Sequence, residues 1–296
     1  MKRFIGYVLG VFVGGVGIAS AQQDFDKVVI KAIPVAGAVH MLEGSGGNIG
    51  VSAGEDGILI VDDQFAPLAD KIKAALRGLG SGTGNPKFLL NTHFHGDHTG
   101  GNPIFGREAT IVAQANVRHR LAAEQRSGDR VTPPMVKQGL PVLTFDQGLS
   151  IHFNGEEIKM MSAPVGHTDT DAFVYFTKSN VIHLGDHFFN GRFPYVDLAG
   201  GGTVDGLIRN IGTALNIVGP DTKIIPGHGA LANKGDLHAY YSMLIETTDL
   251  IRSGIAKGLS LDEAKKAGFP EKWKGWGSGF ISADRYIETL YKSYAK

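Results

Sequence analysis

Three histidines and one aspartate occur within seven residues, in the stretch Thr92–His98 with the sequence THFHGDH. Imidazole nitrogens and carboxylate oxygens are the groups that bind zinc in proteins when thiolates are absent. The chain has only 11 histidines among 296 residues, so this local density is improbable by chance. Two metal ions held by such groups can activate water and polarise a carbonyl. The motif therefore predicts a metal centre with hydrolytic chemistry.

Further metal ligands must come from distant segments, and three isolated residues fit. His167 lies in the glycine-flanked turn 166–169, Asp186 follows an apolar segment, and His228 lies in the Pro-Gly-His-Gly segment 226–229. Each is placed beside a predicted strand end, as a site built from loops on a rigid sheet requires. A single histidine at such a place is more often structural, so the prediction rests on the joint order of all these residues.

Several neighbouring residues are weaker candidates. His183 alternates with apolar residues, which favours a buried structural histidine over a ligand. His187 follows Asp186 directly, and contact with a ligand or with substrate is the less favoured alternative to a structural role. Asp63 and Asp171 flank motif positions, and we expect them to hydrogen-bond the ligand loops.

A substrate surface is indicated only weakly. Phe189 and Tyr195 follow Asp186 closely and fit an aromatic substrate wall about as well as core packing. Arg192 lies between them and is suited to bind a substrate carboxylate, although a solvated loop arginine is the more ordinary reading.

Alternating strand and helix patterns must position these groups. Buried strands are predicted at 57–62 and 88–91, with a helix that Pro67 opens between them. The histidine motif directly follows the second strand, at the edge where ligand sites form in α/β folds. A strand and a helix are predicted over 110–126, and a proline-containing loop over 131–139.

The second half of the chain is predicted to contain a run of strands and then helices. The strands fall at 142–145, 149–153, 157–161, 172–176 and 181–184, with a short one at 223–225. Apolar residues at helical spacing predict helices at 203–218, 237–257 and 283–294, and a capping box at 260–263 opens another.

Taken together, these motifs resemble the metallo-β-lactamase superfamily over about residues 45 to 230. The resemblance rests on the order of five features along the chain. They are Asp62 after a buried strand, HxHxDH at 93–98, Gly-His at 166–167, Asp186 and a late Gly-His at 227–228. It implies an α/β fold, a four-layer αββα sandwich with a C-terminal helical extension and two zinc ions at one edge of the sheets. The implied ligands are His93, His95 and His167 for the first zinc, and Asp97, His98 and His228 for the second, with Asp186 bridging both.

The resemblance also implies a mechanism. A hydroxide bridging two zinc ions would attack a carbonyl, and a zinc would stabilise the oxyanion. Asp97 would act catalytically, because it reaches the site from between two histidines and can orient the hydroxide and shuttle its proton. Asp62 would orient the ligand loop rather than bind metal.

The substrate is less well defined, because this fold hosts many chemistries. Asp186 stands where the commonest β-lactamases have a metal-binding cysteine, and Phe189 stands where a lysine is expected. The chain is more similar to glyoxalase-II-like thioester hydrolases and to exported relatives associated with quinoprotein systems. We expect a small-molecule substrate with a hydrolysable acyl bond, such as a β-lactam, a lactone or a thioester.

Two alternatives from other classes remain open. A mononuclear iron persulfide dioxygenase uses a related fold, and oxygen uptake with persulfides would identify it. A non-catalytic periplasmic metal-binding protein is the other alternative, against which the complete water-activating set of residues argues.

The N-terminus has the pattern of an export signal. Lys2 and Arg3 precede an apolar, glycine-containing segment at 4–18, and small residues occupy 19–21. We expect cleavage after Ala21, a periplasmic or secreted protein and no stable membrane insertion after cleavage; an uncleaved anchor is the alternative. Residues 22–232 would form the main domain, and 233–296 a helical extension packed on it.

Charge and cysteine content narrow the partners. Basic and acidic side chains both number 29, which gives no electrostatic reason to expect binding to nucleic acid or to an anionic membrane. The chain has no cysteine, so disulfides, thiolate ligands and a cysteine nucleophile are excluded. The oligomeric state is left open.

Overall fold

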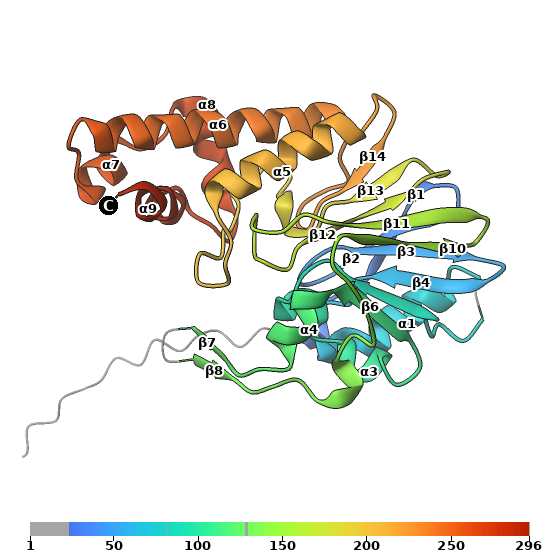
Figure 1. Ribbon diagram of the computed structural model, residues 1–296. Coiled ribbons are helices and arrows are strands. Elements are labelled where there is room, and N and C mark those ends of the chain that lie inside the picture. The colour runs from blue at the N-terminus through green and yellow to red at the C-terminus, as the bar shows by residue number, and fades with distance from the viewer. Residues whose placement is uncertain (1–23, 81, 128–129, 296) are drawn as a thin grey trace, which may run out of the picture.

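Two β-sheets lie face to face between layers of helices in the computed structural model, which describes residues 24–80, 82–127 and 130–295 (Figure 1). The predicted signal segment 1–21 and its cleavage site lie outside the described residues. The first sheet has the strand order β1 (Lys31–Ala36), β2 (Val39–Glu43), β3 (Ile49–Gly54), β4 (Gly57–Val61), β5 (Phe88–Asn91), β6 (Thr110–Gln114) and β9 (Leu143–Phe145). The second has the order β10 (Gly148–Phe153), β11 (Glu156–Ser162), β12 (Ala172–Phe176), β13 (Val181–His183) and β14 (Lys223–Ile225).

The direction of the strands determines where the loops meet. Strands β4, β5, β6 and β9 are parallel neighbours in the first sheet, and β13 and β14 are parallel in the second. The carboxyl ends of parallel strands lie at one edge, so the loops that follow them converge there.

The first sheet is buried on both faces, as the apolar run in β4 predicts. Leu59 and Val61 point toward the second sheet and share a cluster with Val174 of β12. Ile58 and Ile60 point the opposite way and pack in a cluster with the helices. Because successive side chains of a strand alternate between faces, one short apolar segment joins two layers.

Helices cover both outer faces. On the first sheet lie α1 (Ala69–Arg77) and α3 (Asn102–Phe105), with Ile72 and Phe105 in the outer cluster. On the second sheet lie α5 (Val204–Ile217) and α6 (Lys234–Ala256) (Figure 1). Leu207 of α5 and Leu244 of α6 belong to one hydrophobic cluster with Ile182 of β13. This arrangement confirms the predicted four-layer αββα sandwich.

The C-terminal helices share the core of the second sheet. After α6 come α7 (Leu261–Ala267), α8 (Glu271–Lys274) and α9 (Ala283–Tyr294). Leu244, Trp273 and Tyr286 from this segment belong to the same hydrophobic cluster as β13 and α5. The boundary at residues 232 and 233 stays a prediction. No helix in the described part of the chain is long and apolar enough to cross a bilayer.

Some expected elements differ from the structure. The helix predicted to reach residue 126 ends earlier, as α4 (Ala115–Leu121). Residues Gln125–Ser127 (β7) instead pair with Arg130–Thr132 (β8) in a hairpin, where a loop was predicted from 131. The β-branched pair Val131 and Thr132 favours strand structure, which the two nearby prolines obscure in the sequence. Strands β1 and β2 were not predicted.

Candidate metal centre

The candidate ligands lie where strands of both sheets end. The histidine motif follows β5, with His98 inside the short helix α2 (Gly96–Thr99). His167 lies in the loop between β11 and β12, Asp186 in a 3-10 turn after β13, and His228 beyond β14. Local sequence explains the strand ends, because each apolar strand is followed by a turn containing glycine or polar residues.

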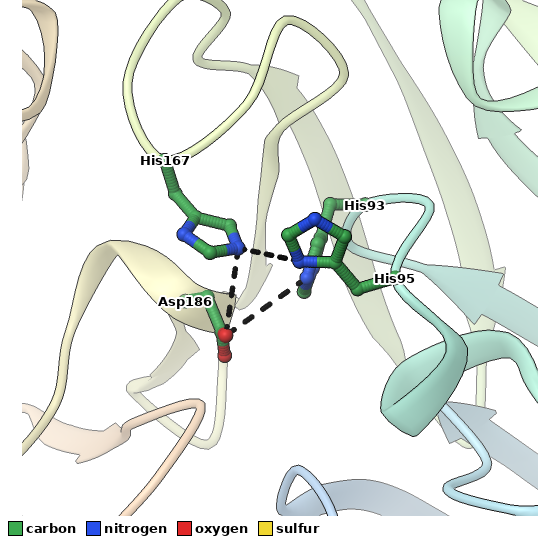
Figure 2. A group of neighbouring side chains, drawn as sticks. All are labelled: His93, His95, His167 and Asp186. Atoms are coloured by element: carbon green, nitrogen blue, oxygen red, sulfur yellow. Dashed lines mark hydrogen bonds and ion pairs between the residues drawn. The ribbon is translucent and has the colours of Figure 1, made fainter. Parts of the chain in front are cut away.

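Four of the predicted ligands face one another in the first cluster (Figure 2). His167 Nε2 lies 2.9 Å from His95 Nδ1. Asp186 Oδ2 lies 3.5 Å from His167 Nε2 and 3.9 Å from His93 Nε2. Donors of a tetrahedral zinc site are about 3.3 Å apart, given zinc–nitrogen bonds of about 2.0–2.1 Å. The cluster therefore has the dimensions of a metal site.

The second cluster consists of Asp97, His98 and His228, whose donor atoms lie within 4.8 Å of one another. Asp97 Oδ2 is 3.3 Å from His228 Nε2 and 3.6 Å from His98 Nε2. The other oxygen of Asp186, Oδ1, faces this cluster at 3.0 Å from His98 Nε2 and 3.4 Å from His228 Nε2. Asp186 thus stands between the two clusters with one oxygen turned to each.

Buried atoms at the meeting point test whether these residues fit a cation. His93 Nε2, His98 Nε2 and Asp186 Oδ1 are buried and make no hydrogen bond within the described part of the protein. Leaving such groups unsatisfied is costly, and a bound cation would supply their missing partner. The donor set, imidazole and carboxylate without thiolate, matches zinc.

Two imidazoles of the first cluster, those of His93 and His167, are held in the neutral form. Burial lowers the pKa of His93 well below its ordinary value and lowers the pKa of His167 to about 4. Neutral imidazole is the form that binds metal.

In the second cluster, by contrast, the pKa values of the two imidazoles are raised. Burial opposes protonation, but Asp186 and Asp97 raise the pKa of His228 to about 9, and these carboxylates with Asp62 raise that of His98 well above its ordinary value. Despite burial, the two imidazoles lower the pKa of Asp97 to about 2. In the metal-free protein, protonated imidazoles therefore supply the positive charge that a metal would replace.

Asp62 lies behind the candidate ligands, in contact with His98. Its Oδ2 accepts hydrogen bonds from His98 Nδ1 at 2.7 Å and from the Thr92 hydroxyl at 2.7 Å, and Oδ1 accepts from the Thr92 amide at 2.8 Å. In the neutral, metal-binding form of His98, Nδ1 carries the proton toward Asp62, which leaves Nε2 free to face Asp186. Asp62 has a left-handed backbone, φ 64°, at the sharp end of β4.

The sequence analysis missed two residues that support the clusters. Asp197 Oδ2 lies 2.9 Å from His95 Nε2, which leaves His95 Nδ1 to face the first cluster. Asn48 donates from its side chain to the carbonyls of Pro226 at 2.9 Å and Gly229 at 2.8 Å, on either side of His228. The only sequence signal for Asp197 is its place two residues after Tyr195, and Asn48 has none.

The other polar neighbours take structural roles. His183 Nε2 donates to the Asn48 carbonyl at 3.0 Å, and its Nδ1 accepts from the Gly185 amide at 3.1 Å, which confirms a buried structural histidine. Asp63 accepts from the Gly101 amide, and Asp171 from the Thr168 amide, as expected of groups that hold the ligand loops. His187 contacts Asn210, outside both clusters.

Two of the three candidate substrate residues border the clusters. The Phe189 ring stacks on His228 at 5.0 Å, and the Tyr195 ring lies 5.9 Å from His95 and 5.8 Å from His167. Arg192 is exposed and contacts neither cluster directly; its side chain lies beside Gly279 of the extension.

Two glycines allow the ligands to approach the backbone. A Cβ atom on Gly47 would lie 2.1 Å from the His98 ring, and one on Gly227 would lie 2.1 Å from Asp186 Oδ1. Any larger residue at these positions would displace a predicted ligand.

Known proteins with the same fold act on several kinds of substrate. The DIM-1 metallo-beta-lactamase matches this structure with a TM-score of 0.61 and 17% identity, covering 74% of this chain and 99% of that one. The sec-alkylsulfatase Pisa1 from Pseudomonas sp. matches with a TM-score of 0.66 and 15% identity, covering 90% of this chain and 50% of that one. At these identities the likeness shows a shared fold alone.

Sequence comparison adds a relative and a family. The hydroxyacylglutathione hydrolase of Nitrosococcus oceani is 30% identical over 148 residues, and this chain spans about half of its length, 49%. Residues 42–229 match the sequence profile of the metallo-beta-lactamase superfamily, a range that contains every residue of both clusters. Because this range is more than half of the chain, the protein belongs to the metallo-beta-lactamase superfamily.

Proposed function

We propose that this protein is a dinuclear zinc hydrolase that cleaves an acyl bond in a small molecule, either a β-lactam amide, a lactone or a thioester. The observation that supports two ions is the double-sided placement of Asp186. One of its oxygens faces His167 and His93, and the other faces His98 and His228. A carboxylate shared between two sets of imidazoles suits a pair of divalent ions.

Each cluster would hold one ion. His93, His95 and His167 would bind the first, Asp97, His98 and His228 the second, and Asp186 both. When bound, such ions lower the pKa of water and polarise a carbonyl oxygen.

Asp97 is proposed as the catalytic carboxylate. Its side chain is 27% exposed, whereas that of Asp186 is 5% exposed, so Asp97 is open to both water and substrate. Its pKa of about 2 keeps it ionised at neutral pH. The Asp97 carboxylate would accept the proton of the attacking water through the oxygen that does not hold the ion, and pass it to the leaving group. This route needs no protein nucleophile.

The test combines metal quantification with a substrate panel of nitrocefin, a lactone and acyl thioesters. An acylglutathione comes first, because of the name of the N. oceani relative. We expect two zinc ions per chain, loss of turnover on chelation and recovery with zinc. His95→Ala and Asp97→Ala should reduce turnover to background without loss of secondary structure by circular dichroism.

Two results would contradict the proposal. Normal turnover by metal-free Asp97→Ala protein would exclude this carboxylate and the metal-dependent mechanism. A single iron per chain, with oxygen uptake on adding a persulfide, would favour a dioxygenase instead.

Export is a separate proposal, supported by the pattern of residues 1–21. The intact mass of protein recovered from the periplasm should correspond to a chain that begins at Gln22. A mass that retains Met1–Ala21 would indicate an uncleaved anchor.

A further inference from the structure

The C-terminal extension reaches the metal centre through the 3-10 turn Gly275–Ser278 and the residues just after it. The Phe193 amide donates to the Trp276 carbonyl at 3.1 Å, and Gly277 lies against the Phe193 ring. Two residues further along, the Tyr195 carbonyl accepts a hydrogen bond from His167 Nδ1 at 2.7 Å. The turn is therefore joined by a short, well-connected segment to a predicted metal ligand.

At this junction, Tyr195, Phe280 and Arg285 form a continuous surface, here called the aromatic lip. The ring of Phe280 meets that of Tyr195 edge-on at 6.5 Å. The guanidinium carbon of Arg285 lies 5.5 Å from the Tyr195 ring centre and 4.8 Å from that of Phe280. Ser282 caps α9 and accepts from the Arg285 amide at 3.3 Å, which fixes Arg285 in the first turn.

Arg285 gives the lip positive charge, although one carboxylate, that of Asp197, also lies near Tyr195. Neither Arg285 nor Arg192, whose aliphatic chain lies beside Gly279, forms a salt bridge with any residue that the structure describes. Both side chains are exposed. Arg120 provides the contrast, since Asp169 binds it through two hydrogen bonds of 3.1 and 2.6 Å. Arg285 is thus a member of the lip without a salt bridge, and the side chain of Arg192 lies beside Gly279, the residue before Phe280.

The chemistry of the lip suits an anionic group on a short apolar arm. A guanidinium that stacks on rings through its face keeps its edge N–H groups free for a carboxylate. The Phe280 ring is 76% exposed and offers apolar contact beside it. A single exposed phenylalanine is ordinary on a protein surface, but this one contacts both the arginine and the ring that borders His95 and His167.

We propose that the aromatic lip selects substrates that carry a carboxylate, with Arg285 as the residue that recognises it and Phe280 as the contact for the adjoining chain. This inference rests on the proposed acyl hydrolysis at the metal centre. The extension would then supply substrate specificity, while the sandwich supplies the reactive groups.

Matched thioesters test this inference in the zinc-loaded protein. Glutaryl and valeryl thioesters of one thiol differ by a carboxylate on the acyl side. Acetyl thioesters of 3-mercaptopropionate and propanethiol differ by a carboxylate on the leaving group. Wild-type protein should prefer the carboxylate member of one pair, and that pair identifies the side of the substrate that meets the lip.

Substitution of Arg285 should remove this preference. We expect Arg285→Gln to lower kcat/KM for the carboxylate substrate about tenfold, through KM, and to leave its neutral partner within about twofold. Arg285→Lys should retain part of the preference, because the charge remains without the planar pair of donors. Phe280→Ala should lower kcat/KM equally for the carboxylate substrate and for its neutral partner.

Arg252 offers a matched control, because it stacks at 5.0 Å over Tyr294 in the same extension and contacts neither the lip nor the clusters. Arg252→Gln should leave kcat/KM unchanged for both the carboxylate and the neutral substrate. Equal loss of kcat/KM for the carboxylate and neutral members in Arg285→Gln would overturn the inference.

A binding measurement separates this inference from the proposed hydrolysis. Calorimetry should show that wild-type protein binds the thioether 4-(ethylthio)butanoate more tightly than its neutral amide. In Arg285→Gln the affinity for the carboxylate should fall about tenfold, and the affinity for the amide should not change. This preference without turnover of any thioester, lactone or β-lactam would refute the proposed hydrolysis and retain the lip. Turnover without either preference would refute only the lip.

Discussion

Two carboxylate–imidazole pairs support the candidate metal centre at different depths. Asp62 and His98 meet at 2.7 Å, and both side chains are fully buried. Asp197 and His95 meet at 2.9 Å, where the imidazole is 18% and the carboxylate 14% exposed. Both pairs orient an imidazole by holding the nitrogen that faces away from the metal cluster.

The surroundings of the two carboxylates differ more than the pairs themselves. Asp62 also accepts two hydrogen bonds from Thr92, so it joins the end of β4 to the loop after β5. Asp197 accepts in addition from the Gly200 amide, within its own loop. The deep pair is therefore part of the folded core, whereas the shallow pair mainly orients one ligand. Removing the first should affect both folding and metal binding, and removing the second should affect mostly metal binding.

The largest effect is expected from Asp62→Asn. An amide nitrogen facing His98 Nδ1 would require that atom to accept, so the proton would move to Nε2, the atom that faces Asp186. We expect the metal-free protein to lose about 3–5 kcal/mol of unfolding free energy, as when a buried charge pair is broken. Urea denaturation measures this loss, and zinc titration should show one site missing.

The adjacent residue provides a matched control. Burial raises the pKa of Asp63 well above its ordinary value, and one of its oxygens has no hydrogen-bond partner. Asp63→Asn should therefore cost much less stability than Asp62→Asn. Similar losses for the two variants would mean that burial of a carboxyl group, rather than the pairing with His98, explains the effect.

A smaller effect on folding is expected from Asp197→Ala. Because this pair is partly exposed, the unfolding free energy of the metal-free protein should fall by about 1 kcal/mol or less. Affinity for zinc should still fall about 10–100-fold, as for other residues that orient a metal-binding imidazole. Competition with a chelator measures the affinity. A stability loss as large as that of Asp62→Asn would remove the distinction between the deep and the shallow pair.

A further effect concerns pH and the exposed side of the centre. The pKa of His228 rises from 6.5 to about 9 in the folded, metal-free protein, against the effect of burial, because Asp186 and Asp97 stabilise its protonated form. This contribution to stability is fully present below pH 6.5 and is lost as the pH rises through 9. Urea denaturation of the metal-free protein should show this decline, and His228→Gln should reduce it. A decline of unchanged slope in His228→Gln would assign it to another group.

The candidate ligands were predictable because their types and their places at strand ends are local features. Apolar strands with glycine beyond them mark the positions of Asp186 and His228 without any knowledge of packing. Hydrogen bonds across the fold are not local. Asp197 is 102 residues from His95 in the sequence, and Asn48 is 178 residues from Pro226. No pattern along the chain connects such pairs.

The helical extension was predictable as helices but not as part of the site. Capping residues and apolar spacing placed α7 and α9, and the capping box at Ser260 is confirmed. Nothing in the sequence indicates that Phe280 and Arg285 lie against Tyr195, since this contact depends on how the turn Gly275–Ser278 packs on the sandwich.

The bonds from Asn48 to the backbone around His228 connect the first sheet to the last strand of the second. A chain in which only the first half has folded would present the THFHGDH motif without its distant partners and would hold zinc weakly. High-affinity metal uptake would then require both sheets to have docked, so ion occupancy would report completed folding.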